Sequence, residues 1–137
     1  MSAPTIKSLL QDDGNETAQR IGFLLLNEFS LLAFASAIEP LRSANRQSGR
    51  ELYQWVIAST DGTPAAASNG VEVASDGDPS VLQDCRMVFV CAGVNVRGNT
   101  DRNTLNLVRR LDRNGAVIGA ICTGTYVTVS YTHLTLP

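Results

Sequence analysis

One cysteine of this chain stands at a position from which a thiol could act on or contact a ligand. Cys122 follows the uninterrupted apolar run of residues 116–121, AVIGAI, and precedes Thr123 and Gly124. A short buried strand that breaks sharply at a cysteine is typical of a nucleophile elbow, where the side chain stands above the carboxyl edge of a parallel sheet and amides of the next helical turn point toward it. The helix dipole would stabilise a thiolate there. The alternative is that Cys122 is one more small buried hydrophobic residue, which the apolar run by itself favours.

The other chemistry-bearing residues exclude several classes of site. The chain has three cysteines and one histidine. Cys85, Cys91 and Cys122 lie in or beside apolar runs without a CxxC pair or a histidine cluster, so the pattern predicts reduced thiols rather than a disulfide framework or a zinc site. No GxGxxG follows the first apolar run, and no glycine-rich loop ends in Gly-Lys-Ser/Thr. We therefore expect no cofactor and no metal.

Charge and hydropathy limit the partners that we expect. The net charge is −2 and 44% of the residues are hydrophobic, which is ordinary for one globular domain and gives no electrostatic footprint for nucleic acid. Arg109, Arg110 and Arg113 do cluster, and we interpret them as the solvated end of a helix. No apolar stretch reaches the length of a membrane span, and the first residues lack the layout of a signal peptide. We expect a cytoplasmic protein that does not interact with membranes.

The periodicity predicts strands that alternate with helices. Apolar runs with both faces hydrophobic indicate buried parallel strands. The predicted strands cover residues 21–26, 53–60, 86–91 and 116–121. Between them we predict one helix capped by Ser30, with Pro40 as a kink or break and Gly49 as its end, and another capped by Thr100 and stopped by Gly115. Residues 65–74 carry an Asn-Gly turn signal and predict a small hairpin or excursion.

This order predicts an α/β fold, a doubly wound and mostly parallel sheet with helices on both faces. Ligands of such sheets bind at the carboxyl ends of the strands. The predicted ligand-contacting residues therefore belong to three strand ends. They are Asn27, Glu28, Gly93, Val94, Asn95, Cys122 and Thr123.

The two ends of the chain differ from this pattern. Residues 1–19 are polar and predict a mobile leader. Residues 128–137 are β-branched, lack helical periodicity and resemble the translation of a sequencing adapter. We interpret them as a non-native tail that interrupts a helix and takes no part in a pocket, so that the natural sequence is truncated near Val127 and His133 does not belong to it.

Three segments together carry a family resemblance. They are IGFLLLNEFSLLAFASAIEPLRSANR, VFVCAG and VIGAICTGTYV, in this order. The region 20–127 resembles the N-terminal domain of AraC-type transcriptional regulators of the GlxA group, a branch of the ThiJ/PfpI (class-I glutamine-amidotransferase-like) superfamily. The resemblance implies a flavodoxin-like domain that senses a small molecule. It also implies a fragment, because the last strands of that domain and the pair of helix-turn-helix units that binds DNA have no counterpart here.

The resemblance also bears on whether Cys122 is catalytic. Hydrolytic members of the superfamily place a histidine beside the elbow cysteine and an acidic residue near the start of the first helix. Here Thr123 and Ala33 stand at those positions, and the nearest substitute acid, Glu28, lies earlier. A thiol without a base or carboxylate lacks the means of proton transfer that nucleophilic catalysis needs. We therefore do not expect an enzyme, and the alternative is a cysteine-dependent amidase or hydrolase.

The expected function is effector binding without turnover. The amides of Gly93, Val94 and Thr123 would form a small anion nest with Cys122 at its floor, while the polar side chains at the strand ends select the ligand. The resemblance implies a small nitrogenous effector, such as an amino acid or a quaternary amine. It also implies a homodimer that contacts DNA only through a missing C-terminal helix-turn-helix domain.

Overall fold

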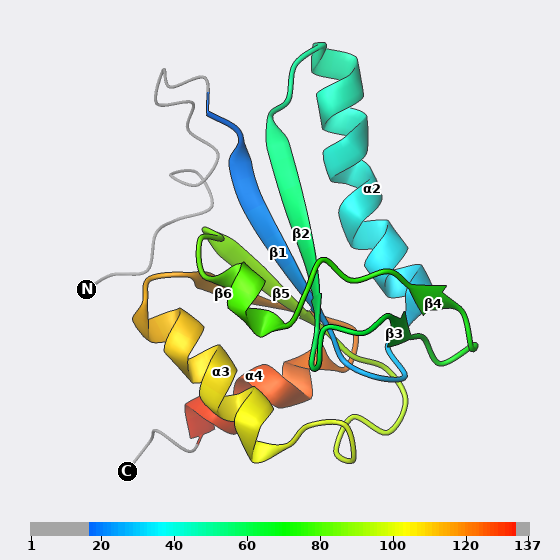
Figure 1. Cartoon of the computed structure of the whole chain (residues 1–137), viewed down its shortest axis with the longest axis vertical. Coiled ribbons are helices and arrows are strands. Elements are labelled where there is room, and N and C mark those ends of the chain that lie inside the picture. Colours follow the sequence, from blue (N-terminus) through cyan, green and yellow to red (C-terminus); the bar gives the residue numbers. More distant parts are fainter. Residues whose placement is uncertain (1–16, 134–137) are drawn as a thin grey trace.

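The computed structural model describes residues 17–133, and its centre is a four-stranded parallel sheet (Figure 1). The strand order is β2-β1-β5-β6, and each neighbouring pair is parallel. The strands are β1 (Gln19–Leu25), β2 (Tyr53–Ser59), β5 (Met87–Cys91) and β6 (Val117–Ile121). The predicted α/β class and all four predicted strands are confirmed, with β1 beginning one residue before the predicted start of the structured region.

Helices cover both faces of this sheet, as the two-sided hydrophobicity of the strands predicts. On one face lie α3 (Arg102–Arg113), α4 (Gly124–His133) and the short 3-10 helix η1 (Pro79–Leu82), which share one apolar core. On the other face lie α2 (Leu31–Ser48) and the two-stranded pair of β3 (Ala65–Ala66) and β4 (Glu72–Val73). Among the described residues, none of the helices combines the length and the apolar character needed to cross a membrane.

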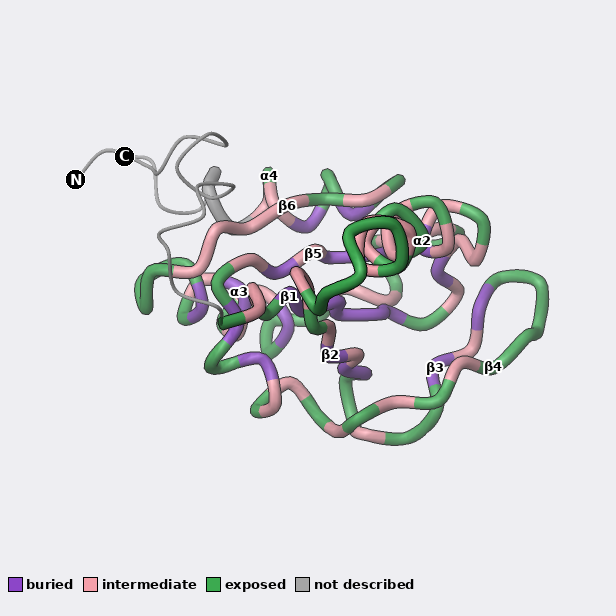
Figure 2. The backbone as a smooth tube through the Cα atoms, turned by 90° about the horizontal axis from the view of Figure 1, so that it is seen from above, coloured by how far each residue is buried: buried purple, intermediate pink, exposed green. Residues whose placement is uncertain are grey.

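The residues of β1 alternate between the two cores. Leu24 packs with the α3 and α4 side, and Phe23 and Leu25 pack with the α2 side. Phe23 has an edge-to-face contact with Phe34 of α2 at 5.4 Å between ring centroids, and a stacked contact with Phe89 of β5 at 5.7 Å. Figure 2 shows buried backbone in β1 and β5, whereas β6 is mostly intermediate. The central strands therefore form the most completely covered part of the sheet.

Helix α2 has the predicted ends but not the predicted break. The Ser30 hydroxyl accepts a hydrogen bond from the Ala33 amide at 3.2 Å, and Gly49 ends the helix with a φ of 71°. Pro40 lies inside the helix on its exposed side, and the helix continues to Ser48. Of the two predicted outcomes, a kink or a break, the break is wrong, because Ile38 and Leu41, on either side of the proline, pack against the core of the sheet. That packing holds the helix together although proline removes one backbone donor.

Two further boundaries differ from the sequence prediction. Asp101, and not Thr100, caps α3: its carboxylate accepts from the Thr104 amide at 2.7 Å, while the Thr100 hydroxyl donates to the Val96 carbonyl. The expectation that the helix does not continue into the tail is also wrong for residues 128–133, because α4 runs to His133. Val127 is fully buried and anchors the start of α4. Once the helix has begun, each later residue adds a backbone hydrogen bond, and the low helix propensity of a β-branched residue costs only about 0.7 kcal/mol or less.

The hairpin predicted at residues 65–74 is present and is attached to the end of β1. Its strands pair antiparallel, and Gly70 has a φ of 88° in the turn. The Glu28 amide donates to the Ala66 carbonyl at 2.8 Å, and the Ser68 amide donates to the Phe29 carbonyl at 2.9 Å. The hairpin thus holds the segment that follows β1. Most of the predicted leader and the last four residues of the predicted tail lie outside the described residues.

Candidate functional site

Three strand ends share an unusual backbone conformation. Glu28, Asn95 and Cys122 have φ values of 63°, 53° and 55°, and in the described part of the chain they are the non-glycine residues with positive φ. They follow β1, β5 and β6, which are consecutive in the sheet. A left-handed conformation costs a residue with a side chain roughly 1–2 kcal/mol, and such strain collects at functional sites. All three lie in the strand ends that the sequence singles out.

Cys122 forms the predicted elbow. It separates β6 from α4, and its side chain is exposed, so the alternative of a buried hydrophobic cysteine is wrong. Gly124 lies so close to β5 that a Cβ atom there would collide with the carbonyl oxygen of Val90. Only glycine permits the backbone of α4 to lie this close to β5. The chain therefore turns sharply between β6 and α4, and Cys122 at this turn is exposed. The Thr123 hydroxyl donates to the Gly93 carbonyl at 2.7 Å and ties the elbow to the end of β5.

The other two thiols lie in the core. Burial raises the pKa of the Cys91 thiol to about 12. Burial also raises the pKa of the Cys85 thiol, and this effect outweighs a hydrogen bond with Arg20 that lowers the pKa. Both thiols therefore stay protonated at neutral pH, and Cys122 is the exposed cysteine. Reaction with a solvent-borne reagent should be confined to the elbow.

The segments after β1 and β5 are paired tightly. The Val94 amide donates to the Glu28 carbonyl at 3.0 Å, and the Ser30 amide donates to the Ala92 carbonyl at 3.3 Å. A Cβ atom on Gly93 would collide with the backbone of residues 28–30, so glycine is required between these bonds. The Val94 amide is therefore not available to an anion, and that part of the predicted nest is wrong. The backbone amides of Gly93 and Thr123 donate a hydrogen bond to no residue of the described chain.

The carboxylate of Glu28 has a partner that the sequence did not indicate. Asn99 donates to Glu28 Oε2 at 2.8 Å and, from the same nitrogen, to the Asn95 carbonyl at 3.2 Å. The amide of Asn99 thus joins two of the three strand ends. Asn27 and Val94 are exposed beside them. We missed Asn99 because it is separated from Glu28 by 71 residues, and no spacing rule connects such positions.

A cation–π pair borders the elbow. The Arg97 guanidinium carbon lies 5.7 Å from the centre of the Tyr126 ring. Tyr126 belongs to the first turn of α4, and Arg97 belongs to the loop between β5 and α3. The pair places a positive charge beside the first turn of α4, where it favours an anionic group. The position of Tyr126, four residues after the elbow, was the one signal in the sequence for this contact.

The residues present offer a weak basis for catalysis or metal binding. Thr123, at the position where the resemblance implies a histidine in hydrolytic members of the superfamily, donates its hydroxyl to the Gly93 carbonyl. Ala33 lies in the first turn of α2, which contains no acidic residue, and Glu28 is bonded to Asn99. Within residues 17–133, no three His, Cys, Asp or Glu side chains gather as a metal ion would require.

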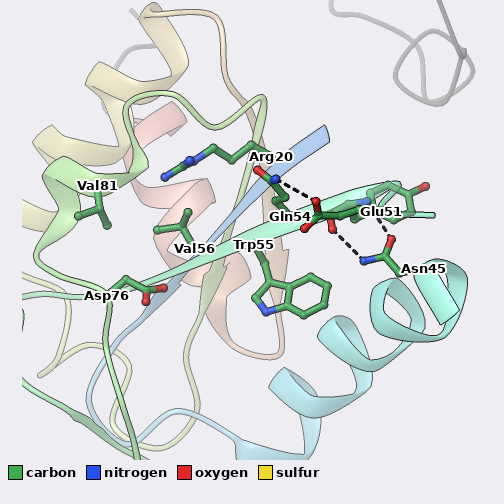
Figure 3. Close-up of a pocket in the computed structure, with 9 residues that line it drawn as sticks. Arg20, Asn45, Glu51, Gln54, Trp55, Val56, Asp76 and Val81 are labelled. Atoms are coloured by element: carbon green, nitrogen blue, oxygen red, sulfur yellow. Dashed lines mark hydrogen bonds between the residues drawn. The ribbon is translucent and has the colours of Figure 1, made fainter. Parts of the chain in front are cut away.

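The groove of about 540 Å³ in Figure 3 lies elsewhere. Its lining includes Arg20 at the start of β1 and Tyr53 at the start of β2. Those residues are at the amino ends of the parallel strands, opposite the elbow. None of the seven predicted ligand-contacting residues lines this groove. The strand-end residues thus share an unusual backbone geometry, and they lie outside this groove.

Comparison with known proteins identifies the relatives of this chain. It is 43% identical over 114 residues to the HTH-type transcriptional regulator GbdR of Pseudomonas aeruginosa, a match that covers 82% of this chain and 30% of that protein. It is 44% identical over 110 residues to the regulator CdhR of the same species, and 42% identical over 114 residues to the regulator GlxA of Rhizobium meliloti. The chain is homologous to HTH-type transcriptional regulators. It spans about a third of the length of these curated relatives.

Solved structures confirm the fold. An AraC family transcriptional regulator from Pseudomonas putida superposes with a TM-score of 0.73 at 24% identity, over 85% of this chain and 62% of that one. A DJ-1 superfamily protein from Agrobacterium tumefaciens gives a TM-score of 0.67 at 22% identity, over 85% and 60% of the two chains. No family model matches the chain. The resemblance found in the sequence is confirmed, and the sheet is of the DJ-1/ThiJ/PfpI flavodoxin-like type.

Proposed function

We propose that this chain is the effector-sensing domain of an AraC-type transcriptional regulator, and that it binds a small nitrogenous metabolite at the elbow without changing it chemically. The observation that carries the proposal is the environment of Cys122. The thiol is exposed in a strained elbow, while its neighbour Thr123 is bonded to Gly93 and the carboxylate of Glu28 is bonded to Asn99. A site built this way can bind a ligand, while the side chains of Thr123 and Glu28, which would have to take the proton of the thiol, are already hydrogen-bonded.

The ligand would lie over the three strand ends. The amides of Gly93 and Thr123 are directed to no other described residue and would donate to an acceptor on the ligand. Glu28 and Asn95 supply oxygen acceptors, which suits a nitrogen-containing group. Asn27, Val94 and Cys122 would contact the remainder of the ligand, since all three are exposed.

The proposal extends to the whole regulator. DNA contact would come from a helix-turn-helix domain outside this chain, in a cytoplasmic homodimer, and residues 20–127 would be the sensing unit. Homology to HTH-type regulators, together with matches that cover about a third of their length, supports this division. Effector binding would shift the equilibrium between two arrangements of the domains. The free energy of that shift cannot exceed the difference between the effector's binding free energies for the two arrangements.

Thermal unfolding in the presence of a panel of amino acids and quaternary amines tests the sensing proposal. A ligand that binds the folded state raises the unfolding temperature by mass action. Glu28→Ala should reduce that shift, whereas Ala120→Ser, an exposed change within β6, should leave it unchanged. A panel member that stabilises both variants and the wild type equally would contradict the proposed site.

The second candidate function is a cysteine-dependent amidase or hydrolase, because an exposed thiol in a left-handed elbow is also the geometry of a nucleophile. The Cys122→Ser variant separates the two functions. A sensor should retain its ligand-induced shift in large part, while a hydrolase should lose nearly all turnover of an amide or ester. Turnover by the wild type that disappears in Cys122→Ser would replace the sensing proposal.

We also propose that residues 128–137 are a non-native tail, although residues 128–133 continue α4. Sequencing the source gene tests this directly. A longer reading frame that diverges from the present one after Val127 and encodes two helix-turn-helix units would support both the tail and the regulator proposals. The same ten codons inside a continuous natural frame would contradict the tail proposal alone.

A further inference from the structure

The outer edge of β2 presents backbone groups in a regular series. Among the described strands, β2 pairs only with β1. The Leu52 carbonyl accepts from the Gln19 amide, so the alternation of a parallel ladder directs the N–H and C=O of Tyr53, Trp55 and Ile57 away from β1. Each of these residues offers one donor and one acceptor on the same side. An edge of this kind needs partners for its backbone groups.

Two of the three pairs are filled by residues of the chain itself. The side-chain amide of Asn45 accepts from the Tyr53 N–H and donates to the Tyr53 C=O, both at 2.9 Å (Figure 3). At Ile57, the carboxylate of Asp76 accepts from the N–H at 2.8 Å, and the Asp76 amide donates to the C=O at 2.7 Å. In both cases a group with an acceptor and a donor on one edge closes the strand.

The pair between them is open. The N–H and C=O of Trp55 have no hydrogen-bond partner within the described chain. Asn45, Trp55 and Asp76 all line the groove of about 540 Å³. The indole lies between β2 and α2, and the side chain of Arg20 lies on the other side of the strand (Figure 3). The groove is open to solvent, so water and a small molecule can both reach the open pair.

The two caps restrict what can occupy this position. A further β-strand would have to displace Asn45 or Asp76, because an extended partner pairs with several residues in succession. A primary carboxamide directs an N–H and its C=O to one edge, as Asn45 does at Tyr53. We propose that the open backbone pair of Trp55 is a binding site for a small primary carboxamide, or a cyclic amide of the same edge chemistry, separate from the elbow.

The test uses the full chain and benzamide as the probe, followed by ¹H–¹⁵N NMR. Benzamide has the required edge, and its ring provides apolar surface for measurable binding. N,N-Dimethylbenzamide is the matched control because it retains the ring and carbonyl but has no N–H. We expect benzamide to shift the Trp55 amide and its neighbours in a saturable way, and the dimethyl compound to have a small effect there. Equal shifts from both compounds, or no saturable shift at Trp55 because water alone occupies the pair, would overturn the proposal.

Substitutions at Trp55 separate the backbone from the indole. Trp55→Ala removes the indole and keeps the N–H, whereas Trp55→Pro removes both. Proline is tolerated on an edge strand where the N–H faces outward, so the β1 ladder should survive. We expect benzamide to bind about fivefold more weakly to W55P than to W55A, the effect of one hydrogen bond of about 1 kcal/mol. Equal affinities in two folded variants would contradict the proposal. If W55P does not fold, the comparison of the two benzamides on the wild type still decides it.

Discussion

The left-handed conformation of Cys122 leads to a prediction about stability. Its φ of 55° is one that an L-residue with a Cβ atom adopts at a cost and glycine adopts freely. If the elbow stores this strain, Cys122→Gly should release it, while Cys122→Ala should keep it. The comparison of C122G with C122A is therefore the informative one, because both variants remove the thiol and neither changes the hydrogen bond between Thr123 and Gly93.

The expected difference follows from two opposing effects. Release of the left-handed conformation stabilises the folded state by roughly 1–2 kcal/mol. Glycine also raises the conformational entropy of the unfolded chain, which costs about 0.4–1 kcal/mol relative to alanine. The net expectation is that C122G is more stable than C122A by roughly 0–1.6 kcal/mol, with a central value of about 0.8 kcal/mol. Cys122 is exposed, so loss of its packing should add little to either variant.

Urea unfolding of C122G and C122A measures this difference. The comparison is valid if the two variants have equal m-values, because a change in m would mean that the unfolded or folded state has changed. The control is Ala120→Gly, two residues earlier and also exposed, where φ is not positive. There glycine should destabilise by about 0.5–1 kcal/mol. Opposite signs at the two positions would support the elbow strain. A C122G variant no more stable than C122A would refute it, and the backbone argument for the strand-end site would then lose its main support.

The remaining predictions concern the thiols and the aromatic core. In native alkylation followed by mass spectrometry, Cys122 should react well before the buried Cys85 and Cys91, and equal labelling of all three in folded protein would contradict the elbow geometry. Because burial raises the folded-state pKa of Cys91 from 9.0 to about 12, its stabilising contribution should be complete below about pH 9 and decline above it, by up to about 4 kcal/mol. Wild type should therefore lose more stability than Cys91→Ala as the pH rises past 9, and parallel pH profiles would exclude this effect. Phe23→Ala should cost about 3–5 kcal/mol in urea unfolding because the ring is fully buried and contacts two other aromatic rings, and a cost below about 1 kcal/mol would show that the core is not packed as described.

Local signals placed most elements correctly because they act over a few residues. The apolar run before Cys122 predicted β6, Ser30 predicted the start of α2, and the Asn-Gly pair predicted the turn of the hairpin. The failures were also local. Asp101 competed with Thr100 as a cap, and Pro40 was outweighed by the packing of its neighbours. Propensity decides such positions only where tertiary contacts do not.

The continuation of α4 is a second case in which tertiary packing outweighs local propensity. Residues 128–133 have no helical periodicity, and the sequence predicted that the helix stops before them. Burial of Val127 against the α3 side fixes the helix, and the backbone then extends it. Helical conformation therefore does not decide whether these residues are native.

By itself, the sequence determined the parallel α/β class, the three strand ends and the family, because two-sided apolar runs and a sharp turn at Cys122 are encoded in contiguous residues. The tertiary structure alone decided which backbone groups are occupied. The Glu28 carbonyl binds the Val94 amide, and Asn99 reaches the Glu28 carboxylate across 71 residues of chain. Asn45 and Asp76 cap β2 and leave Trp55 open. Such pairings depend on how distant segments are packed, and a hydrogen bond between them has no periodicity along the chain from which it could be predicted.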